Sequence, residues 1–512
     1  MQELKIKKNL PAVSGQKYSD LSLFKWMKSI IKEDETVRFM KKGKDFINDK
    51  EIEELLQRNR NGEKQRVKDI IQKSLSIQRL EPYETAALLN VKDKALWEEI
   101  FQAAGEIKRN VYDNRIVTFA PLYCSNFCVN SCRYCAFRRE NSRQKRRKLS
   151  LEEVRKETEA LISFGHKRLI VVYGEHPFSD INYIADTIKT IYNTRLKATV
   201  GYGEIRRVNV NAPPMDIERL RILKNVGIGT YQVFQETYHH QTYKRVHPRG
   251  IKANYQWRLY ALHRAQMAGI DDVAIGVLFG LYDWKFEVMG LLYHTIELEK
   301  QFGGVGPHTI SFPRLEPAAN TSFIQESKYK VSDEDFKKLI AVIRLSVPYT
   351  GLILTAREPA HIRKAVLPLG ITQTDASTRI GIGAYSEEYN HQEAERQQFL
   401  LGDTRSLDEL IRELALNGQI TSFCTAGYRC GRTGSRIMDL LKTGKERWFC
   451  KLNAVLTFRE WIDDFASAQT KTVGEKVIQK EIAEIKEKLP GVFPKFVELY
   501  KRIKHGERDL YF

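Results

Sequence analysis

Short β-rich segments alternate eight times with helix-length stretches between residues 113 and 400. Several of these stretches end in glycine directly before the next β-rich segment, as in SFGHKRLIVVYG, which is typical of a helix end followed by a strand. Strands that alternate with helices form a parallel sheet, and eight such units close into a barrel. The sequence therefore predicts an α/β fold, a TIM-type (β/α)8 barrel with strands at Ile116–Leu122, Arg168–Tyr173, Val208–Asn211, Thr230–Phe234, Val273–Phe279, His308–Phe312, Leu352–Thr355 and Ile371–Asp375.

Helical patterns flank this region on both sides. Apolar residues recur at helical spacing in the N-terminal part and again after about residue 400. We therefore expect a helical N-terminal extension (1–112), a barrel (113–400) and a helical C-terminal region (401–512). The expected helices are Lys64–Ser76, Pro82–Asn90, Lys94–Tyr112, Ser406–Asn417, Thr457–Ala468 and Lys476–Leu489.

Polar residues follow nearly every expected strand. A TIM-type barrel carries its chemistry in the loops after the strand C-termini, so these side chains are expected to converge on one face. They are Gly174, Glu175, Asn211, Gln235, Glu236, Arg314, Arg357, Glu358, Ser377, Thr378 and Arg379.

The loop after the first strand holds four cysteines, Cys124, Cys128, Cys132 and Cys135, and the last three are spaced C-x3-C-x2-C. Three thiolates hold three corners of a four-iron cubane and leave one iron open, as chelation and reductive cleavage of S-adenosylmethionine (SAM) require. The alternative is a structural zinc site or scattered buried thiols. Zinc sites usually pair two C-x2-C units, and none follows within about fifty residues. The motif favours a [4Fe-4S] cluster on Cys128, Cys132 and Cys135.

Other residues of this face are candidate contacts for SAM. Tyr134 lies inside the cysteine loop and fits beside an adenine, although ordinary loop packing is an alternative. Gly174 allows backbone to approach a ligand closely. Structural ion pairs are the alternative for the charged members of the set, which is Glu175, Glu204, Arg206, Gln235 and Glu236.

Arginines and histidines supply the remaining candidates of the barrel. Arg314, Arg357 and Arg379 are candidates for a substrate carboxylate, which guanidinium groups bind in a bidentate way, or for salt bridges at the barrel rim. His294 and His308 are inward candidates or satisfied core residues.

The charge of +19 comes from 83 basic and 64 acidic residues. Its dense basic run, Arg138–Lys148, lacks interleaved aromatic residues, so we expect a solvated surface, or an acidic partner such as an electron-donating protein, rather than nucleic acid. No apolar run approaches the ~20 residues of a membrane helix. The N-terminus lacks a signal core, and we expect a soluble, cytoplasmic protein without a membrane partner.

Several motifs resemble the HydG family of FeFe-hydrogenase maturases, which are radical SAM tyrosine lyases. They run from Phe46 to NAVLTFREWIDDFAS and include CVNSCRYCAFRR, GHKRLIVVYGEHP, GEIRRVNVN, GTYQVFQETYH, GVGPHTISFPR and SFCTAGYRCGRTG. The resemblance implies a cubane on Cys128, Cys132 and Cys135 that generates a 5′-deoxyadenosyl radical. That radical takes hydrogen from the amino group of tyrosine, and Cα–Cβ cleavage gives p-cresol and dehydroglycine. It also implies a reductant such as ferredoxin or flavodoxin and other hydrogenase maturases as partners.

The family breaks dehydroglycine down to carbon monoxide and cyanide at a second cluster, held by a C-x2-C-x22-C motif. In this sequence Cys424 and Cys450 occupy its first and third positions, and Gly427 occupies the second. The resemblance places His294 as a ligand of that site, and Cys430 is either a candidate substitute for the missing thiol or a free thiol.

The alternatives are three. A rescued site makes a working maturase. A two-thiol site makes an enzyme similar to the ThiH 2-iminoacetate synthase of thiamine biosynthesis. A non-catalytic iron–sulfur carrier is the third.

Overall fold

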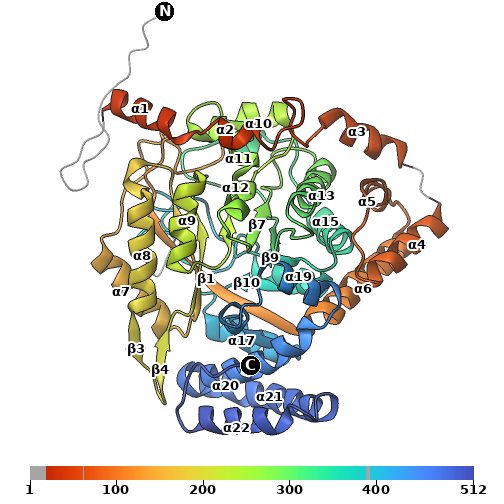
Figure 1. The fold of residues 1–512 in the computed structure, drawn as a ribbon, viewed down its shortest axis with the longest axis vertical. Helices are drawn as coiled ribbons and strands as arrows, with labels where there is room; N and C mark the ends of the chain where they lie inside the picture. Colours follow the sequence, from red (N-terminus) through yellow and green to blue (C-terminus); the bar gives the residue numbers. More distant parts are fainter. Residues whose placement is uncertain (1–18, 61–62, 388–391) are drawn as a thin grey trace, which may run out of the picture.

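The computed structural model describes residues 19–60, 63–387 and 392–512 (Figure 1). Its centre is a closed barrel of eight parallel strands, and all eight lie where the sequence predicts them. The barrel closes between the last and first strands, where Val117 lies opposite Gln373. The strands are β1 (Arg115–Ser125), β2 (Arg168–Tyr173), β5 (Arg207–Asn211), β6 (Tyr231–Gln232), β7 (Val273–Gly276), β8 (Thr309–Ser311), β9 (Gly351–Leu354) and β10 (Gln373–Asp375).

Three further strands were not predicted. β11 (Ile420–Ser422) pairs in parallel with the first residues of β1, where Arg115 lies opposite Ile420. β3 (Arg195–Lys197) and β4 (Tyr202–Glu204) form a separate antiparallel hairpin. Each has three residues, which is too short to show the alternation that marks a strand in a sequence.

Helices surround the barrel, and several of them begin at a side-chain cap. The Ser150 hydroxyl accepts a hydrogen bond from the backbone N–H of Glu153, whose carboxylate accepts one from Ser150 N–H in return. Asp180, Asp216 and Ser332 cap other barrel helices. The outer helices are α7 (Leu151–Ser163), α8 (Ile181–Asn193), α9 (Ile217–Val226), α10 (His240–Val246), α11 (Tyr255–Leu259), α12 (Ala261–Met267), α13 (Trp284–Gln301), α14 (Phe323–Glu326), α15 (Asp333–Ser346), α16 (Ala360–Val366) and α17 (Leu407–Leu416).

The expected helices of both extensions are present in the structure, and further helices occur beside them. Three N-terminal helices end within one residue of their predicted ends, and two C-terminal ones are longer than predicted. Among the described residues, no helix combines the length and the apolar character that membrane crossing requires. The helices are α1 (Asp20–Ile30), α2 (Asp34–Val37), α3 (Asp49–Arg58), α4 (Lys64–Leu75), α5 (Pro82–Leu89), α6 (Lys94–Tyr112), α18 (Ala426–Arg429), α19 (Gly434–Lys442), α20 (Glu446–Phe465), α21 (Ala468–Lys488) and α22 (Phe493–Lys504).

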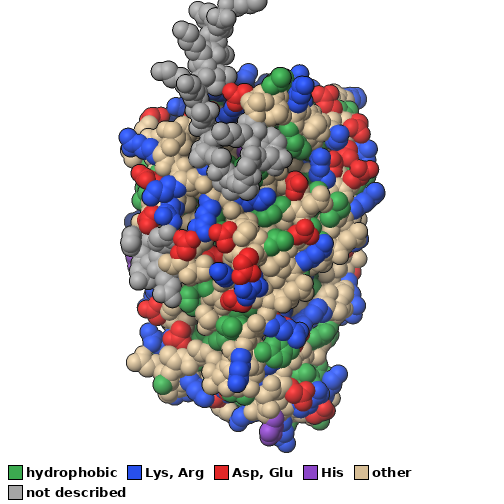
Figure 2. Space-filling view, turned by 90° about the vertical axis from the view of Figure 1, so that its left-hand side faces the viewer, with side chains coloured by type: hydrophobic (Ala, Val, Ile, Leu, Met, Phe, Trp, Pro, Cys, Tyr) green, Lys and Arg blue, Asp and Glu red, His purple; other side chains and the backbone are tan. Residues whose placement is uncertain are grey.

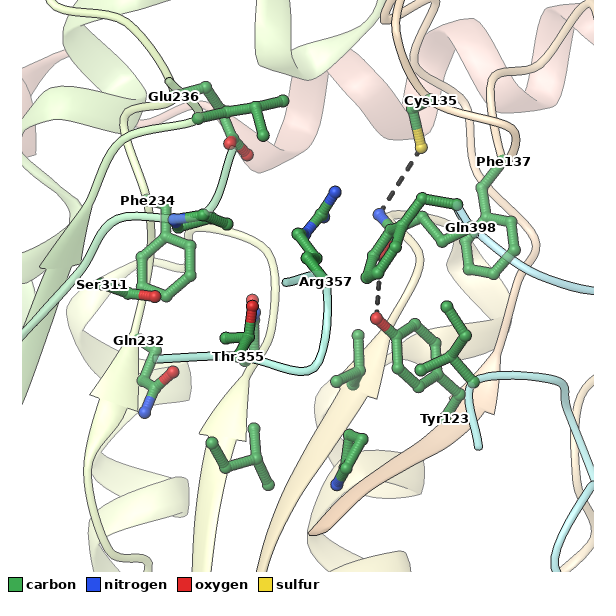
Figure 3. Close-up of a pocket in the computed structure, with 18 of the residues that line it drawn as sticks. Tyr123, Cys135, Phe137, Gln232, Phe234, Glu236, Ser311, Thr355, Arg357 and Gln398 are labelled. Atoms are coloured by element: carbon green, nitrogen blue, oxygen red, sulfur yellow. Dashed lines mark hydrogen bonds between the residues drawn. The ribbon is translucent and has the colours of Figure 1, made fainter. Parts of the chain in front are cut away.

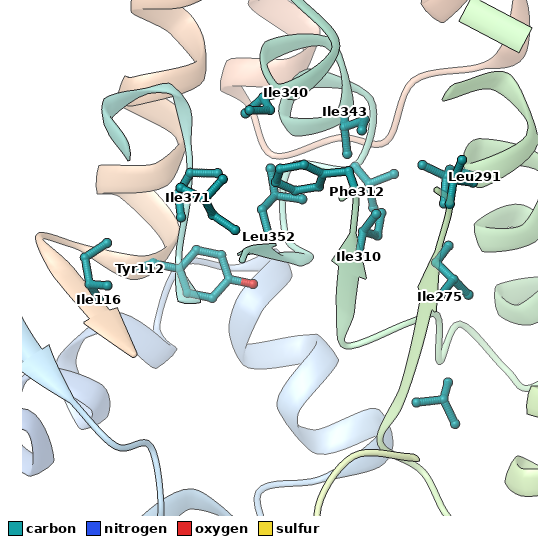
Figure 4. Packing of buried hydrophobic residues seen from close by; sticks show 14 of the residues in the cluster. Tyr112, Ile116, Ile275, Leu291, Ile310, Phe312, Ile340, Ile343, Leu352 and Ile371 are labelled. Atoms are coloured by element: carbon teal, nitrogen blue, oxygen red, sulfur yellow. The ribbon is translucent and has the colours of Figure 1, made fainter. Parts of the chain in front are cut away.

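The largest core lies between the outer surface of the strands and the helices. Ile310 of β8 and Leu352 of β9 are fully buried and belong to the same cluster as Ile340 and Ile343 of α15 (Figure 4). Alternate residues of a strand point to opposite faces, so the other set of side chains points into the barrel. The helical layer thus holds the strands in place while their C-terminal ends are left for chemistry.

The C-terminal helices α20, α21 and α22 pack across the far end of the barrel (Figure 1). A fully buried ion pair fixes their ends, because Arg508 contacts both carboxylate oxygens of Asp464 at 2.6 and 3.0 Å. The same carboxylate accepts hydrogen bonds from the backbone N–H groups of Val200 and Gly201 next to the β3–β4 hairpin. This pair therefore joins the C-terminus to the barrel.

Arg508→Ala should lower the free energy of unfolding by about 3–5 kcal/mol, because it leaves the Asp464 carboxylate buried without its cation. Urea denaturation followed by circular dichroism measures the change. The matched control is Arg502→Ala, which removes an exposed pair with Glu507 and should leave the stability close to that of the wild type, because solvent screens an exposed pair. Equal losses in the two variants would contradict the assignment.

Candidate active site at the barrel mouth

The three motif cysteines lie in a long loop after β1, residues 126–148, which we call the cysteine loop. Cys128, Cys132 and Cys135 all line one cavity at the C-terminal mouth of the barrel. The loop is held by backbone hydrogen bonds, among them Val129 N–H to the carbonyl of Glu175 at 2.8 Å. These backbone hydrogen bonds help to place the three thiols in one cavity.

The donor set of this cavity fits a cubane with one open iron. Three thiols line it, and among the described residues no fourth cysteine joins them. Burial raises the pKa of the Cys128 and Cys132 thiols, so metal binding has to drive their deprotonation. Cys124 faces away: its Sγ lies 3.9 Å from the carbonyl of Leu122, and burial raises its pKa to about 12.

Gly174 at the end of β2 is required by the cysteine loop itself. A Cβ atom at this position would lie 2.2 Å from the backbone carbonyl oxygen of Phe127. Its N–H donates to the carbonyl of Ser125 at 2.9 Å. The next residue, Glu175, accepts a hydrogen bond of 2.6 Å from the side chain of Asn130 in the loop. The strand end and the cysteine loop therefore interlock.

Charged side chains line the opposite wall of the cavity. Glu236 follows β6 and adopts a positive φ of 71°, which is unusual for a residue other than glycine. Its carboxylate contacts Lys252 Nζ at 2.7 Å and Arg258 at 3.5 Å. Burial alone would raise its pKa, but these two cations lower it overall. Glu236 is thus held as a carboxylate within the cavity.

Arg357 reaches into the middle of the cavity from the loop after β9 (Figure 3). Its guanidinium stacks on the ring of Phe399, 3.2 Å from the ring centroid. Among the described residues it makes no ion pair. Glu316 lines the same cavity, and burial together with the nearby Glu358 raises its pKa to about 7. Arg357 is consequently available for a carboxylate from outside the protein.

The other two candidate arginines are already occupied. Arg314 makes two hydrogen bonds of 3.0 and 3.1 Å to the carboxylate of Glu358, and a further one of 2.8 Å to Asp333. Arg379 donates to the carbonyl oxygen of Ala384 at 3.1 Å. Neither lines the cavity with the cysteines.

Two predicted SAM contacts lie at the opposite end of the barrel. Arg206 precedes β5, so it points away from the mouth, and it pairs with Glu460 of α20 at 2.8 Å and with Glu204 at 3.3 Å. Gln235 is buried but does not line the cavity. Tyr134 does line it, and its hydroxyl lies 2.8 Å from Nε2 of His247. The structure thus brings Tyr134, Gly174, Glu175 and Glu236 together with the cysteines and leaves Glu204, Arg206 and Gln235 outside.

The basic run after the cysteines largely supports the loop. Arg146 donates to the carbonyl oxygens of Asn126 and Arg138, both at 2.6 Å, and to that of Phe137 at 2.9 Å. Arg147 pairs with Glu153 at 2.6 Å. Acidic and basic side chains are interspersed over the face shown in Figure 2. Much of the charge that suggested a docking surface is therefore used internally.

A second, distal pocket lies near the N-terminal end of β1. Cys424, Gly427 and Cys450 line it together with His308 and Arg115. Cys450 Sγ lies 3.3 Å from a carboxylate oxygen of Glu446, and burial raises its pKa despite the nearby Arg115. Cys430 is absent from this lining, and its Sγ contacts the carbonyl of Phe512 at 3.3 Å.

The distal pocket presents two thiols where a cubane with an open iron needs three, so its residues do not fit that group. The expected histidine is also a different one. His294 lies in α13, where its Nδ1 meets the hydroxyl of Tyr238 at 2.9 Å and its ring stacks on His263. His308, directly before β8, is the histidine of the pocket.

Residues 122–290 match the Radical SAM superfamily, and residues 311–420 match the Biotin and Thiamin Synthesis associated domain. A crystal structure of HydG, a maturase of the [FeFe]-hydrogenase, is 49% identical, with a TM-score of 0.87 over 91% of this chain and 100% of that one. The chain belongs to the HydG family of radical SAM enzymes.

A second HydG structure, from Carboxydothermus hydrogenoformans, is 38% identical, with a TM-score of 0.72 over 90% of this chain and 99% of that one. The 2-iminoacetate synthase of Escherichia coli (strain K12) is 30% identical over 68% of this chain and 88% of that protein. The radical SAM domain implies a [4Fe-4S] cluster and SAM as cofactors. The spacing of the three cysteines in the HydG-type barrel agrees with that implication.

Gly174→Ala should displace the cysteine loop, because the added methyl group meets backbone rather than a flexible side chain. We expect a stability loss of about 1–3 kcal/mol and a lower iron content after anaerobic reconstitution, measured by iron and sulfide analysis. Gly491→Ala is the matched control, since no atom lies within 4 Å of its Cβ position. Full iron loading of Gly174→Ala would show that the loop tolerates the methyl group.

Proposed function

We propose that this chain is a radical SAM lyase that cleaves the Cα–Cβ bond of tyrosine and releases p-cresol and dehydroglycine. The observation that carries the proposal is the placement of Arg357. A half-buried arginine that makes no ion pair with any described residue lines the same cavity as Cys128, Cys132 and Cys135. A free amino acid with a carboxylate suits that arrangement. The similarity of this chain to HydG and to 2-iminoacetate synthase also supports the proposal.

The cavity offers separate surfaces for cofactor and substrate. When bound, a four-iron cubane and SAM supply a 5′-deoxyadenosyl radical. On the cofactor side, Glu236 accepts hydrogen bonds and the end of β2 presents backbone groups at Gly174. On the substrate side, Arg357 holds the carboxylate. Phe119, Ile170 and Ile353 form a buried apolar cluster that lines the same cavity, and an aromatic ring is excluded from water there.

The destination of dehydroglycine divides two candidate roles. The similarity to HydG supports assembly of the hydrogenase cofactor, with other maturases as partners and a ferredoxin or flavodoxin as the reductant. The two-thiol distal pocket favours release of dehydroglycine before carbon monoxide and cyanide are made, as a 2-iminoacetate synthase requires. Both roles share the tyrosine cleavage.

Anaerobic incubation of the reconstituted chain with tyrosine, SAM and dithionite tests the shared step. We expect p-cresol and 5′-deoxyadenosine in amounts that rise together, measured by liquid chromatography. Release of 5′-deoxyadenosine without p-cresol would retain the radical chemistry and reject tyrosine. The absence of both products from a fully loaded cluster would leave only the carrier role.

Arg357→Gln should raise the KM for tyrosine roughly 10- to 100-fold, because a charge-assisted hydrogen bond contributes about 1.5–3 kcal/mol. The cluster should load normally, since among the described residues no hydrogen bond or ion pair joins the Arg357 side chain to the cysteine loop. Tyrosine titrations of p-cresol formation measure the KM. A change in kcat alone, with KM unaltered, would contradict a carboxylate-binding role.

Glu316 predicts a pH dependence of tyrosine binding. Its pKa of about 7 means that it is neutral below pH 7 and becomes an anion above it. The anion competes with the substrate carboxylate for Arg357, so the KM for tyrosine should rise as the pH increases through 7. Glu316→Gln should remove this rise, and KM measurements between pH 6 and about 8 compare the two proteins. Identical profiles would exclude Glu316 as the cause.

The iron content should distinguish the two roles. We expect about four irons per wild-type chain and about eight in Gly427→Cys, because that variant supplies the third thiol. The added side chain has room, since its nearest neighbour is Arg432 Nε at 3.7 Å. Cys430→Ser is the matched control and should retain about four irons. Eight irons in the wild type, lost in Cys430→Ser, would show that Cys430 completes the site.

A further inference from the structure

We propose that Gln398, oriented by Tyr123, is a positioning residue that raises the reduction potential of the cluster bound by the cysteine loop. Its amide N–H group donates a hydrogen bond to the sulfur of Cys135. The inference concerns the cluster before any substrate binds, so it is independent of the proposed tyrosine chemistry.

The contact joins residues that are distant in the sequence. Gln398 Nε2 lies 3.5 Å from Cys135 Sγ, and the Tyr123 hydroxyl lies 3.0 Å from Gln398 Oε1 (Figure 3). The phenol donates to the amide oxygen while the amide N–H points at the sulfur, and a cluster-bound thiolate can only accept a hydrogen bond. Tyr123 and the Cys135 thiolate together favour the orientation of the amide in which its N–H points at Cys135.

Burial preserves this arrangement across a wide pH range. The Tyr123 side chain is 6% exposed, and burial raises the pKa of its phenol. Tyr123 therefore remains a hydrogen-bond donor at physiological pH. It also lies on β1, the strand from which the cysteine loop departs, and its own position is fixed by the barrel.

The backbone around Gln398 forms a strap, residues 392–401, that lies along the cysteine loop. Ala136 N–H donates to the carbonyl of Gln398 at 3.2 Å, and Lys145 N–H donates to that of Glu395 at 3.0 Å. Leu400 N–H donates to the carbonyl of Pro317 at 2.8 Å. Backbone hydrogen bonds on both sides of Gln398 hold the strap against its neighbours. They therefore fix the backbone position from which the Gln398 side chain reaches the sulfur.

Gln398 differs from the other amide near a cysteine. Asn130 Nδ2 lies 3.6 Å from Cys128 Sγ, but it also donates to Glu175 at 2.6 Å and belongs to the cysteine loop itself. Within the described part of the chain, Gln398 is the side chain outside the loop that donates to a motif cysteine. Its role can therefore be removed without altering the loop sequence.

The physical effect follows from charge. Reduction adds an electron to a group that already carries the negative charge of thiolates, and an N–H directed at a sulfur stabilises the more negative state. Loss of the Gln398 donor should therefore make reduction harder. The reduced-to-oxidised ratio at fixed poise should fall about three- to tenfold, which corresponds to ~28 to ~59 mV for a one-electron couple.

The experiment is a redox titration of the full, reconstituted chain without SAM or tyrosine, monitored by electron paramagnetic resonance of the reduced cluster. Gln398→Leu should lower the midpoint potential by the stated amount. Tyr123→Phe should lower it less, because the amide remains but is no longer oriented. In the double variant, Tyr123→Phe should add nothing to Gln398→Leu, since both act through one hydrogen bond.

Gln392→Leu is the matched control in the same strap, because Gln392 bonds Leu401 and not a cysteine, and its potential should equal that of the wild type. The proposal is overturned if Gln398→Leu has the wild-type potential, if Gln392→Leu shifts it equally, or if the two substitutions add. Should Gln398→Leu fail to bind a cluster, Tyr123→Phe decides, and an unchanged potential there would reject the proposal.

Discussion

The pairing of β1 with three neighbours is the constraint on which both pockets depend. This strand contacts β2 along its C-terminal half, β10 at its centre and β11 at its start. Its C-terminal end leads into the cysteine loop, whereas Arg115 at its beginning lines the distal pocket. Eleven residues at about 3.3 Å each place the two ends roughly 35 Å apart. One strand thus sets the distance between the two cysteine groups.

The two pockets share strands β1, β9 and β10, but different residues line them. The mouth is closed by loops that interlock with the end of β2, as the close approach of Gly174 and Phe127 shows. The distal pocket is closed by β11, α18 and α20, with Glu446 and Cys450 contributed by α20. Since no described residue lines both pockets, a thiol can be lost from one pocket without removing a lining residue of the other.

The elements of the barrel could be predicted because they repeat, and the partners of individual side chains could not. Arg314 and Arg357 both follow strands, and only the structure shows that Glu358 pairs with Arg314 while Arg357 makes no ion pair with a described residue. Gln398 carried no signal at all, since its role depends on a strap that returns 263 residues after Cys135. The sequence indicates His308 as an inward candidate. Its proximity to Cys424 depends on β11, and a strand of three residues is too short to predict.

Gly427 and Cys430 are close in the sequence, but they have different surroundings in the structure. Gly427 lies in α18 and lines the distal pocket. Cys430 directly follows α18, and its Sγ contacts the carbonyl oxygen of Phe512. The side chain of Asn453 in α20 makes two hydrogen bonds to Phe512. Its amide N–H donates to the carbonyl oxygen of Phe512, and its amide oxygen accepts from the backbone N–H of Phe512. For Cys430 to enter the pocket, its contact with Phe512 would have to break. The distal pocket therefore presents the two sulfurs of Cys424 and Cys450, while the Cys430 thiol lies outside it.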